Sequence, residues 1–254
     1  MKRQGDRTPA IRSARPLPSA SQRFKRYPAY KDSGVEWLGE TPAHWRSVAL
    51  SHVTRSRCDG PFGSGLKSEH YSQSGIRVVR LQNIGWTEFL DKDRVFIDEA
   101  HATQLGEHGV KAGDLLIAGL GDDGHPVGRA CVAPSAIEPA MVKADCFRFR
   151  LDRRQVLPRF AAYQLSATAL AAAGSLATGA TRARMNLTVT ATRKVAFPTL
   201  LEQQAIVDAL DEVAETVSAL VARVSDAIDH LKELRTALIS AAVTGKIDVR
   251  EEVA

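Results

Sequence analysis

The sequence predicts an α+β protein in which a globular mixed α/β domain is followed by a long C-terminal coiled-coil helix. Three observations lead to this prediction. Short β-like runs alternate with glycine-rich turns through the middle of the chain, one apolar helical stretch follows them, and an unbroken heptad pattern fills the C-terminal part. Hydrophobic residues make up 44% of the sequence, which is enough to bury a core and excludes a disordered chain.

The first 26 residues (1–26) form a segment of their own. They are rich in Arg, Pro and Ser, show no hydrophobic periodicity, and are typical of a flexible extension. Residues 1–30 carry eight basic and one acidic side chain, residues 31–200 carry 21 and 17, and residues 201–254 carry five and 11, for net charges of +7, +4 and −6. The total of +5 therefore favours nucleic-acid binding only weakly. The extension is either a tail with no specific role or a non-specific phosphate tether.

Cysteine usage and hydropathy indicate a cytoplasmic protein. The three cysteines form no CxxC pair, and their odd number argues against a disulfide framework or a zinc cluster and for a reducing compartment. No apolar run approaches the roughly 18 residues of a membrane span. The basic N-terminal segment also lacks the apolar stretch of a secretory signal. We therefore expect no membrane association.

Residues 27–198 are expected to form the globular domain. Its clearest β-like runs, separated by turn-forming residues, are residues 76–84, 114–120 and 146–151. A helical stretch begins at Pro158 and is expected to end near Gly179. Irregularly spaced strands with one clear helix favour an α+β domain over a doubly wound sheet.

Residues 199–254 carry the strongest structural signal. Thr199 and Glu202 have the spacing of a capping box at a helix start, and Gly245 is suited to end the helix. Between them, apolar residues recur in steps of four and three over 33 residues, a heptad a/d pattern about 50 Å long. Its members are Ile206, Leu210, Val213, Val217, Leu220, Val224, Ala227, Leu231, Leu234 and Leu238.

The heptad stripe is wider than a two-stranded coiled coil needs. The neighbouring e positions Ala214, Val221 and Ile228 are apolar, whereas such a coiled coil usually keeps them polar. A wide stripe must be covered from more than one side, so we expect the helix to lie in a bundle or against another protein. The alternative is a helix packed on its own domain. The predicted interface comprises Ile206, Leu210, Val213, Val217, Leu220, Val221, Val224, Ile228, Leu231, Leu234 and Leu238.

Motifs of catalysis and cofactor binding do not support an enzyme. Residues Gly119–Gly124 spell GxGxxG after a strand-like run, but His125 and Pro126 follow where a nucleotide site needs a helix to begin. The glycine-rich segment 174–181 lacks the lysine of a P-loop, no histidines have metal-ligand spacing, and there is no GxSxG elbow. We therefore expect a binding protein with no catalytic residue, no cofactor of its own and no metal.

Six segments carry a recognisable family pattern. They are residues 27–45, residues 60–67 with the sequence GPFGSGLK, residues 113–117, the group Pro198, Glu202, Gln203 and Ile206, residues 231–235, and residues 243–250. Together they resemble specificity subunits of type I restriction-modification enzymes. The first segment is similar to the opening of those subunits, and the last three are similar to the start and end of their conserved helix.

The resemblance implies a non-catalytic protein that reads double-stranded DNA. In that family, globular target-recognition domains bind DNA, and long helices space these domains and dock modification (methyltransferase) subunits. Restriction subunits then join for ATP-dependent translocation and cleavage. Members usually carry two target domains and two helices, whereas this chain has one of each. We therefore expect a half-length form that pairs as a homodimer through its helix. The alternative is a coiled-coil adaptor whose globular domain binds protein and retains no DNA specificity.

Candidate DNA-contacting residues fall in three loops or strand ends. Base readout needs Arg, Lys, Asn or Gln, and phosphate contacts need basic side chains or backbone amides. The candidates are Gly63, Ser64 and Lys67 in the first loop, Arg80, Gln82 and Asn83 in the second, and Arg182, Arg184 and Asn186 in the third. The third is the strongest, because two Arg and one Asn fall within five residues between Gly179 and a β-like run. The adjacent turn Gly60-Pro61-Phe62 is expected to be architectural.

Overall fold

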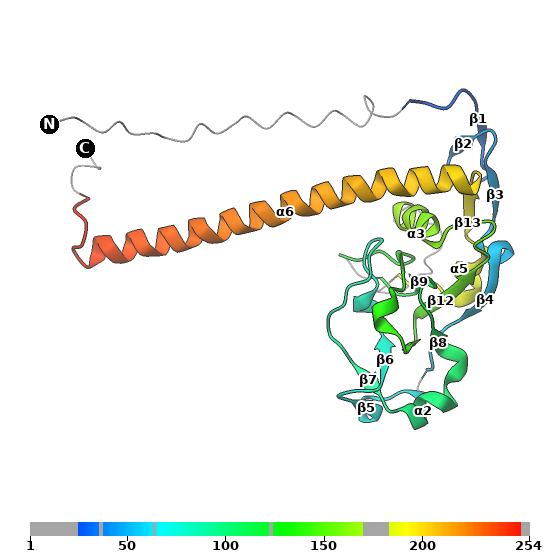
Figure 1. The fold of residues 1–254 in the computed structure, drawn as a ribbon, viewed down its shortest axis with the longest axis horizontal. Coiled ribbons are helices and arrows are strands. Elements are labelled where there is room, and N and C mark those ends of the chain that lie inside the picture. The colour runs from blue at the N-terminus through cyan, green and yellow to red at the C-terminus, as the bar shows by residue number, and fades with distance from the viewer. Residues whose placement is uncertain (1–24, 36–37, 63–64, 122–123, 170–182, 250–254) are drawn as a thin grey trace.

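The computed structural model describes residues 25–35, 38–62, 65–121, 124–169 and 183–249. Figure 1 shows a globular domain at one end of the molecule and a long helix, α6 (Leu200–Val243), that leaves this domain and extends far beyond its edge. The predicted α+β fold with a long C-terminal helix is confirmed. None of the helices within these ranges is long and apolar enough to cross a membrane.

Two sheets supply most of the domain core. A four-stranded antiparallel sheet has the order β10-β9-β12-β4, and a five-stranded mixed sheet has the order β5-β7-β6-β11-β8. The strands of the first are β4 (Thr54–Cys58), β9 (Leu115–Ala118), β10 (Ala130–Val132) and β12 (Cys146–Leu151). The strands of the second are β5 (Tyr71–Ser72), β6 (Ile76–Val79), β7 (Phe96–Ile97), β8 (Gly109–Val110) and β11 (Ala140–Val142).

Strand β9 is buried on both faces because its side chains alternate between two hydrophobic clusters. Leu115 and Ile117 pack in the cluster that contains Phe147 of β12 and the apolar face of α3 (Pro158–Ala167). Leu116 lies in the other cluster, between this sheet and the five-stranded sheet. Burial on both faces explains why the sequence of β9 reads as a continuous apolar run with no alternation.

Two of the predicted element boundaries differ from the structure. Helix α3 ends at Ala167, earlier than the predicted end near Gly179, and residues 170–182 lie outside the described part of the chain. The run predicted to be β-like after Asn186 begins instead with a short helix, α5 (Leu187–Thr192). The reason is local: the Asn186 side chain accepts a hydrogen bond from the Val189 amide at 2.8 Å and thereby caps the helix start.

Two small sheets lie beside the start of α6 (Figure 1). One pairs β1 (Tyr30–Asp32) with β2 (Glu40–Pro42), and the other pairs β3 (Arg46–Ala49) with β13 (Lys194–Phe197). Strand β13 therefore leads the chain directly into α6. A further short helix, α2 (Glu99–Gln104), lies at the end of the domain away from α6 (Figure 1).

Helix α6 begins and ends near the predicted residues. The Thr199 side chain accepts from the Glu202 amide, but the Glu202 carboxylate turns away from Thr199, so only half of the predicted capping box forms. The helix ends at Val243, and Gly245 follows with a φ of 70°, in the left-handed region that favours glycine. Its 44 residues correspond to about 66 Å of helix.

Candidate nucleic-acid interface

Arg184 is held in a defined position at the domain surface. The amide of the following residue, Met185, donates to the carbonyl of Gly119 at 2.9 Å, so the segment pairs with the loop after β9. The Arg184 guanidinium lies against the carboxylate of Asp145, with Nε at 3.0 Å and Nη2 at 2.9 Å from Oδ1. It also lies 5.9 Å from the centre of the Phe62 ring. This side chain is therefore half-exposed and already oriented.

Asp59 connects the first predicted loop to the third. Its carboxylate accepts hydrogen bonds from the amides of Gly60 at 2.7 Å and Asp145 at 2.9 Å. A Cβ on Gly60 would lie 2.0 Å from the carbonyl carbon of Lys143, so only glycine fits there. Burial, with a smaller contribution from the Asp145 carboxylate, raises the pKa of Asp59 to about 6. The loop that carries Phe62 is thus fixed against the turn that holds Arg184.

Asn83 in the second predicted loop has a structural role in the interior of the domain. Its side chain is fully buried and donates to the carbonyls of Leu90 at 3.0 Å and Lys92 at 2.7 Å. Its side-chain oxygen accepts from the Arg80 amide at 2.9 Å. Because every polar atom of this amide has an internal partner, Asn83 stabilises the loop. This burial contradicts the prediction that its side chain contacts DNA.

The other two residues of the second loop remain at the surface. Arg80 donates from Nη2 to the carbonyl of Asp93 at 2.7 Å. Gln82 is exposed. Together with Lys92 and His125, Gln82 lines a cavity of about 200 Å³ between this loop and the segment after β9. The cavity shows that the second loop lies next to the segment that pairs with Arg184.

Arg129 holds these loops together and was not identified from the sequence. Its guanidinium is buried and donates from Nε to Ile84 O at 2.7 Å and from Nη2 to Leu81 O at 3.0 Å. From Nη1 it donates to the carbonyls of Leu120 and Pro126, both at 3.2 Å. One side chain therefore joins the second loop to the glycine-rich segment. A single arginine beside a strand gives no sequence pattern that could have revealed this role.

The GxGxxG segment is explained by packing. A Cβ on Gly119 would lie 2.4 Å from the Phe147 ring, and a Cβ on Gly121 would lie 2.5 Å from the amide of Val127. In the part of this region that the structure describes, the chain continues into strand β10. A dinucleotide site needs a helix N-terminus at this point. The glycines instead permit close contacts that bring the loops together.

The remaining predicted residues divide into three groups. Lys67 is exposed, and its ammonium lies 3.5 Å from the carboxylate of Glu69. Asn186 is exposed at the start of α5 and uses its side-chain oxygen as a helix cap. Gly63, Ser64 and Arg182 lie outside the described residues. The loops of Phe62, Gln82 and Arg184 are thus brought together, and Phe62, expected from the sequence to be architectural, is a further candidate.

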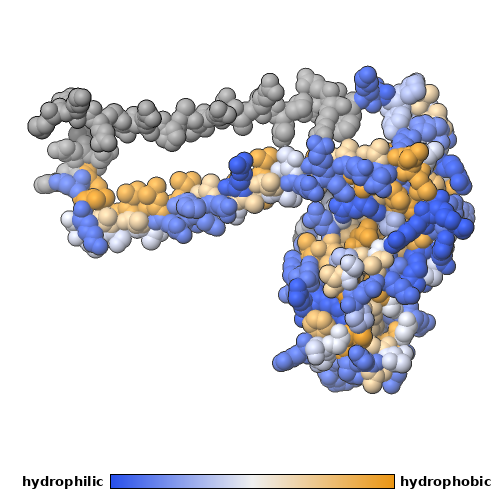
Figure 2. All heavy atoms as spheres, viewed as in Figure 1, coloured by the Kyte–Doolittle hydropathy of each residue, from blue (hydrophilic) through white to orange (hydrophobic). Residues whose placement is uncertain are grey.

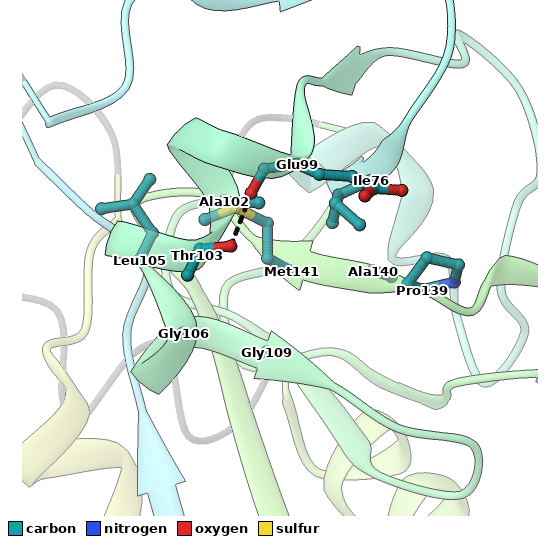
Figure 3. Close-up of a pocket in the computed structure, with 10 residues that line it drawn as sticks. All are labelled: Ile76, Glu99, Ala102, Thr103, Leu105, Gly106, Gly109, Pro139, Ala140 and Met141. Carbon is teal, nitrogen blue, oxygen red and sulfur yellow. Dashed lines mark hydrogen bonds between the residues drawn. The ribbon is translucent and has the colours of Figure 1, made fainter.

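A separate cavity of about 310 Å³ lies beside α2 (Figure 3), at the end of the domain away from α6 (Figure 1). Its walls are mainly apolar or glycine residues of the five-stranded sheet and α2, among them Met141. The Thr103 hydroxyl donates to the backbone carbonyl of Glu99 at 2.7 Å. The described ranges contain no group of three or more His, Cys, Asp or Glu residues arranged to hold a metal ion. The cavity has no convergent set of polar groups suited to catalysis.

The base of α6 is joined to the N-terminal segment through Glu202. Its carboxylate accepts from Tyr27 Oη at 2.7 Å and Trp45 Nε1 at 3.1 Å, and it lies 2.9 Å from His44 Nε2. Burial and the hydrogen bond to Glu202 raise the pKa of Tyr27 to about 12. The segment 27–45 and the start of α6, which resemble the same family in the sequence, therefore contact each other directly.

The apolar stripe of α6 is uncovered beyond the base of the helix. Ile206 packs against the domain core and Val207 is buried there, so Ile206 does not belong to the exposed interface that was predicted. From Leu210 onward the heptad residues are exposed, with Leu231 exposed at 63%. The e residues Val221 and Ile228 are exposed as well. Figure 2 shows apolar side chains along one edge of the projecting helix.

Comparison with known proteins gives a match in fold. No protein-family model matches the sequence, and no curated protein matches it. A chain from a structure of complex assembly and conformational transition in the type I R-M system shares 19% identity over 80% of this chain and 46% of its own length, with a TM-score of 0.60. The HsdS subunit from Thermoanaerobacter tengcongensis shares 20% identity over 86% of this chain and 48% of its own length, with a TM-score of 0.54.

These likenesses define the class of fold to which the molecule belongs. The chain, a mixed α/β domain followed by one long helix, has the fold of the matched part of HsdS, the specificity subunit of type I restriction-modification systems. It spans just under half of the length of the two solved chains.

Proposed function

We propose that this protein is a DNA sequence-recognition subunit of a type I restriction-modification system and has no catalytic centre of its own. The observation that carries the proposal is the presence, in one chain, of an HsdS-like fold and a helix whose apolar stripe projects uncovered from the domain. An uncovered apolar stripe of this length is unfavourable in water, which favours a partner for the helix. A subunit of a larger complex has such partners.

The proposed DNA-facing surface comprises Phe62, Lys67, Arg80, Gln82 and Arg184. Basic side chains neutralise phosphates, while Arg and Gln can read base edges in the major groove. Arg184 is well suited to this role, because a guanidinium that is already oriented loses less side-chain entropy on binding. Phe62, which is 53% exposed, adds an apolar ring that can contact a thymine methyl group in the major groove.

The exposed stripe of α6 is proposed to serve two partners. The a and d residues, from Leu210 to Leu238, form the narrow seam of a coiled coil. The e residues Val221 and Ile228 widen this seam and provide a second face. We assign the seam to pairing with a second copy of the chain and the second face to a modification (methyltransferase) subunit. Restriction subunits would then join the complex that these contacts build.

Pairing with a second copy is proposed because the a and d residues of α6 lie uncovered beyond the base of the helix. The matched parts make up 46% and 48% of the two solved chains that share its fold, so one copy corresponds to about half of such a chain. Two copies that pair their helices antiparallel would place one domain at each end, with two-fold symmetry. The recognised DNA would then be an inverted repeat, with two half-sites separated by an unread spacer. This arrangement compensates for the poor genomic discrimination of one short half-site.

A binding experiment with the modification subunit tests the proposal. The purified complex is mixed with a pool of duplexes, the bound sequences are recovered, and binding is measured at rising salt concentration. We expect one sequence class to be enriched over an unrelated duplex of the same length, with an affinity that falls steeply as salt rises. If the complex binds no duplex in a salt-dependent way, the DNA-recognition role is overturned and a coiled-coil adaptor is favoured.

A further inference from the structure

Besides the contacts of Glu202 and the packing of Val207, helix α6 is hydrogen-bonded to the domain at two further levels, and the first is the buried side chain of Gln203. Its Nε2 donates to the carbonyls of Pro198 at 3.0 Å and Gln155 at 2.9 Å. Its Oε1 accepts from the amide of Leu157 at 2.8 Å. Gln203 is fully buried, so the start of α6 has a fixed point inside the domain surface.

The second level is formed by Asp211 and two residues of α3. Arg159 donates to Asp211 Oδ1 from Nε at 3.0 Å and from Nη2 at 2.8 Å. The Tyr163 hydroxyl donates to the same oxygen, and the Arg159 guanidinium lies 4.7 Å from the Tyr163 ring. Asp211 therefore holds α6 to α3 through two different side chains. We call these three residues the Asp211 clamp.

The Asp211 clamp is itself anchored in the domain backbone. Arg159 Nη1 donates to the carbonyl of Thr87 at 2.6 Å. Thr87 has a φ of 89°, which is strained for a β-branched residue, and its amide donates to Ala130 O at 3.0 Å. Strained backbone of this kind persists only where the surroundings fix it. The Arg159 guanidinium thus joins the backbone at Thr87 to α6.

The direction of α6 depends on the position of the Asp211 clamp. From Glu215 to Ser240 every residue of α6 is exposed, so this stretch has no domain surface against which to rest. Gln203 and Asp211 are eight residues apart along the helix, about 12 Å, whereas Gln203 and Val243 are about 60 Å apart. A shift of about 1 Å at Asp211 therefore moves the far end of α6 by about 5 Å, more than the roughly 3.4 Å between successive base pairs.

We propose that the Asp211 clamp determines how many base pairs separate the two half-sites that the protein recognises. This inference rests on the proposed function, in which two copies pair through α6 and each places its domain near the far end of the other's helix. A tilt at the clamp then moves one domain relative to the other. One added base pair also rotates a half-site by roughly 35° about the DNA axis, so a fixed helix direction selects one spacer length.

The test compares two clamp variants with a matched control. Asp211→Asn keeps the size of the side chain and removes the charge that binds Arg159, and Tyr163→Phe removes one hydroxyl donor. Asp208→Asn is the control, because Asp208 is exposed and accepts from Gln204 within α6 at 2.7 Å. Each full-length variant is bound with its modification subunit to duplexes that carry the two half-sites, as identified from the methylated bases, at a series of spacer lengths.

The wild type and Asp208→Asn should bind one spacer length best. We expect Asp211→Asn and Tyr163→Phe to show a shifted or broader optimum, with an about two- to fivefold loss of discrimination against spacers one base pair longer or shorter. Preference for the bases within each half-site should stay unchanged, which separates positioning from loss of DNA contact.

Two results would overturn the inference, and they can be told apart. If both clamp variants keep the spacer profile of Asp208→Asn, the clamp does not set the spacing, although the paired function stands. If the wild type itself shows no preferred spacer, the inference fails together with the proposed paired function.

Discussion

Arg184 is the residue on which the proposed DNA contact depends most directly, because Asp145 and the Phe62 ring already orient its guanidinium. We expect Arg184→Ala to weaken specific binding by about 1–3 kcal/mol and to relax the preference at one base, as for a bidentate contact. Arg154→Ala is the control, since Arg154 is exposed and paired with Asp152 outside the proposed surface. Competition gel shifts measure both. Wild-type affinity and preference in Arg184→Ala would contradict the role of this loop.

Asp59 makes the stability of the same region depend on pH. Its folded pKa of about 6 exceeds the ordinary value of about 3.9, so the ionised carboxylate destabilises the fold at pH 7. This destabilisation is lost as the pH falls through 6, while the unfolded carboxylate stays ionised down to about pH 4. The full shift corresponds to about 3 kcal/mol, and partial exposure of Asp59 reduces the effect to roughly 1 kcal/mol.

Urea unfolding at pH 5 and pH 7 measures this effect. The free energy of unfolding of the wild type should rise relative to that of Asp59→Asn when the pH is lowered from 7 to 5. The side-chain amide oxygen in this variant can still accept from the Gly60 amide, and the neighbouring Asp145 and Arg184 are unchanged, so the comparison isolates the ionisation of Asp59. Parallel stability profiles for the two proteins would contradict the raised pKa.

Single residues are the scale at which the sequence predicted least. Asn83 and Asn186 have the side-chain chemistry of base readers, yet one is buried in a loop and the other caps α5. Arg129 joins the same loops but belongs to no motif. The type of a residue determines which hydrogen bonds its side chain can make. Whether the side chain makes them with DNA or within the protein depends on its burial and its neighbours, which are set by contacts between distant segments.

At the scale of elements, the sequence predicted α6 well because a heptad pattern is local and repeated. Ten matched positions outweigh any single misleading residue, and the end at Gly245 follows from the left-handed conformation that glycine permits. Helix α5 was missed for the opposite reason. Its sequence, LTVTAT, is rich in β-branched residues that favour strands, and its six residues are too few for periodicity to correct that preference.

Leu231 and Ile228 separate the two proposed faces of α6. Leu231→Asp places a charge in the seam and should abolish self-association, because an unpaired buried charge costs several kcal/mol. Ile228→Glu should leave self-association largely intact and weaken binding of the modification subunit. Both residues are exposed in the single chain, so the domain itself should fold normally.

Sedimentation measures self-association in this pair of variants, and co-purification measures binding of the modification subunit. Ser225→Asp is the matched control, since it adds the same charge at an exposed position outside the stripe. If Ile228→Glu recovers the modification subunit at the wild-type yield, α6 has no second packing face at this position.

The whole molecule combines the domain that we propose to face DNA with a helix whose direction is set by contacts between distant parts of the chain. Tyr27 and Glu202 are 175 residues apart, and Arg159 and Asp211 are 52 residues apart. No periodic pattern encodes such contacts, so the sequence predicted a long helix but not the angle at which it leaves the domain. This angle leaves the apolar stripe of α6 exposed. The exposed stripe favours an interface with other chains and disfavours the alternative in which α6 packs along its own domain.

The most direct test of the central claim is the sequence methylated in cells. Native genomic DNA is sequenced for modified bases with and without the gene for this chain. A specificity subunit that acts as a symmetric pair should account for one bipartite motif, which is palindromic and disappears when the gene is removed. Unchanged methylation would contradict the DNA-recognition role in a cell that expresses the modification subunit, and an asymmetric motif would contradict the symmetric pair.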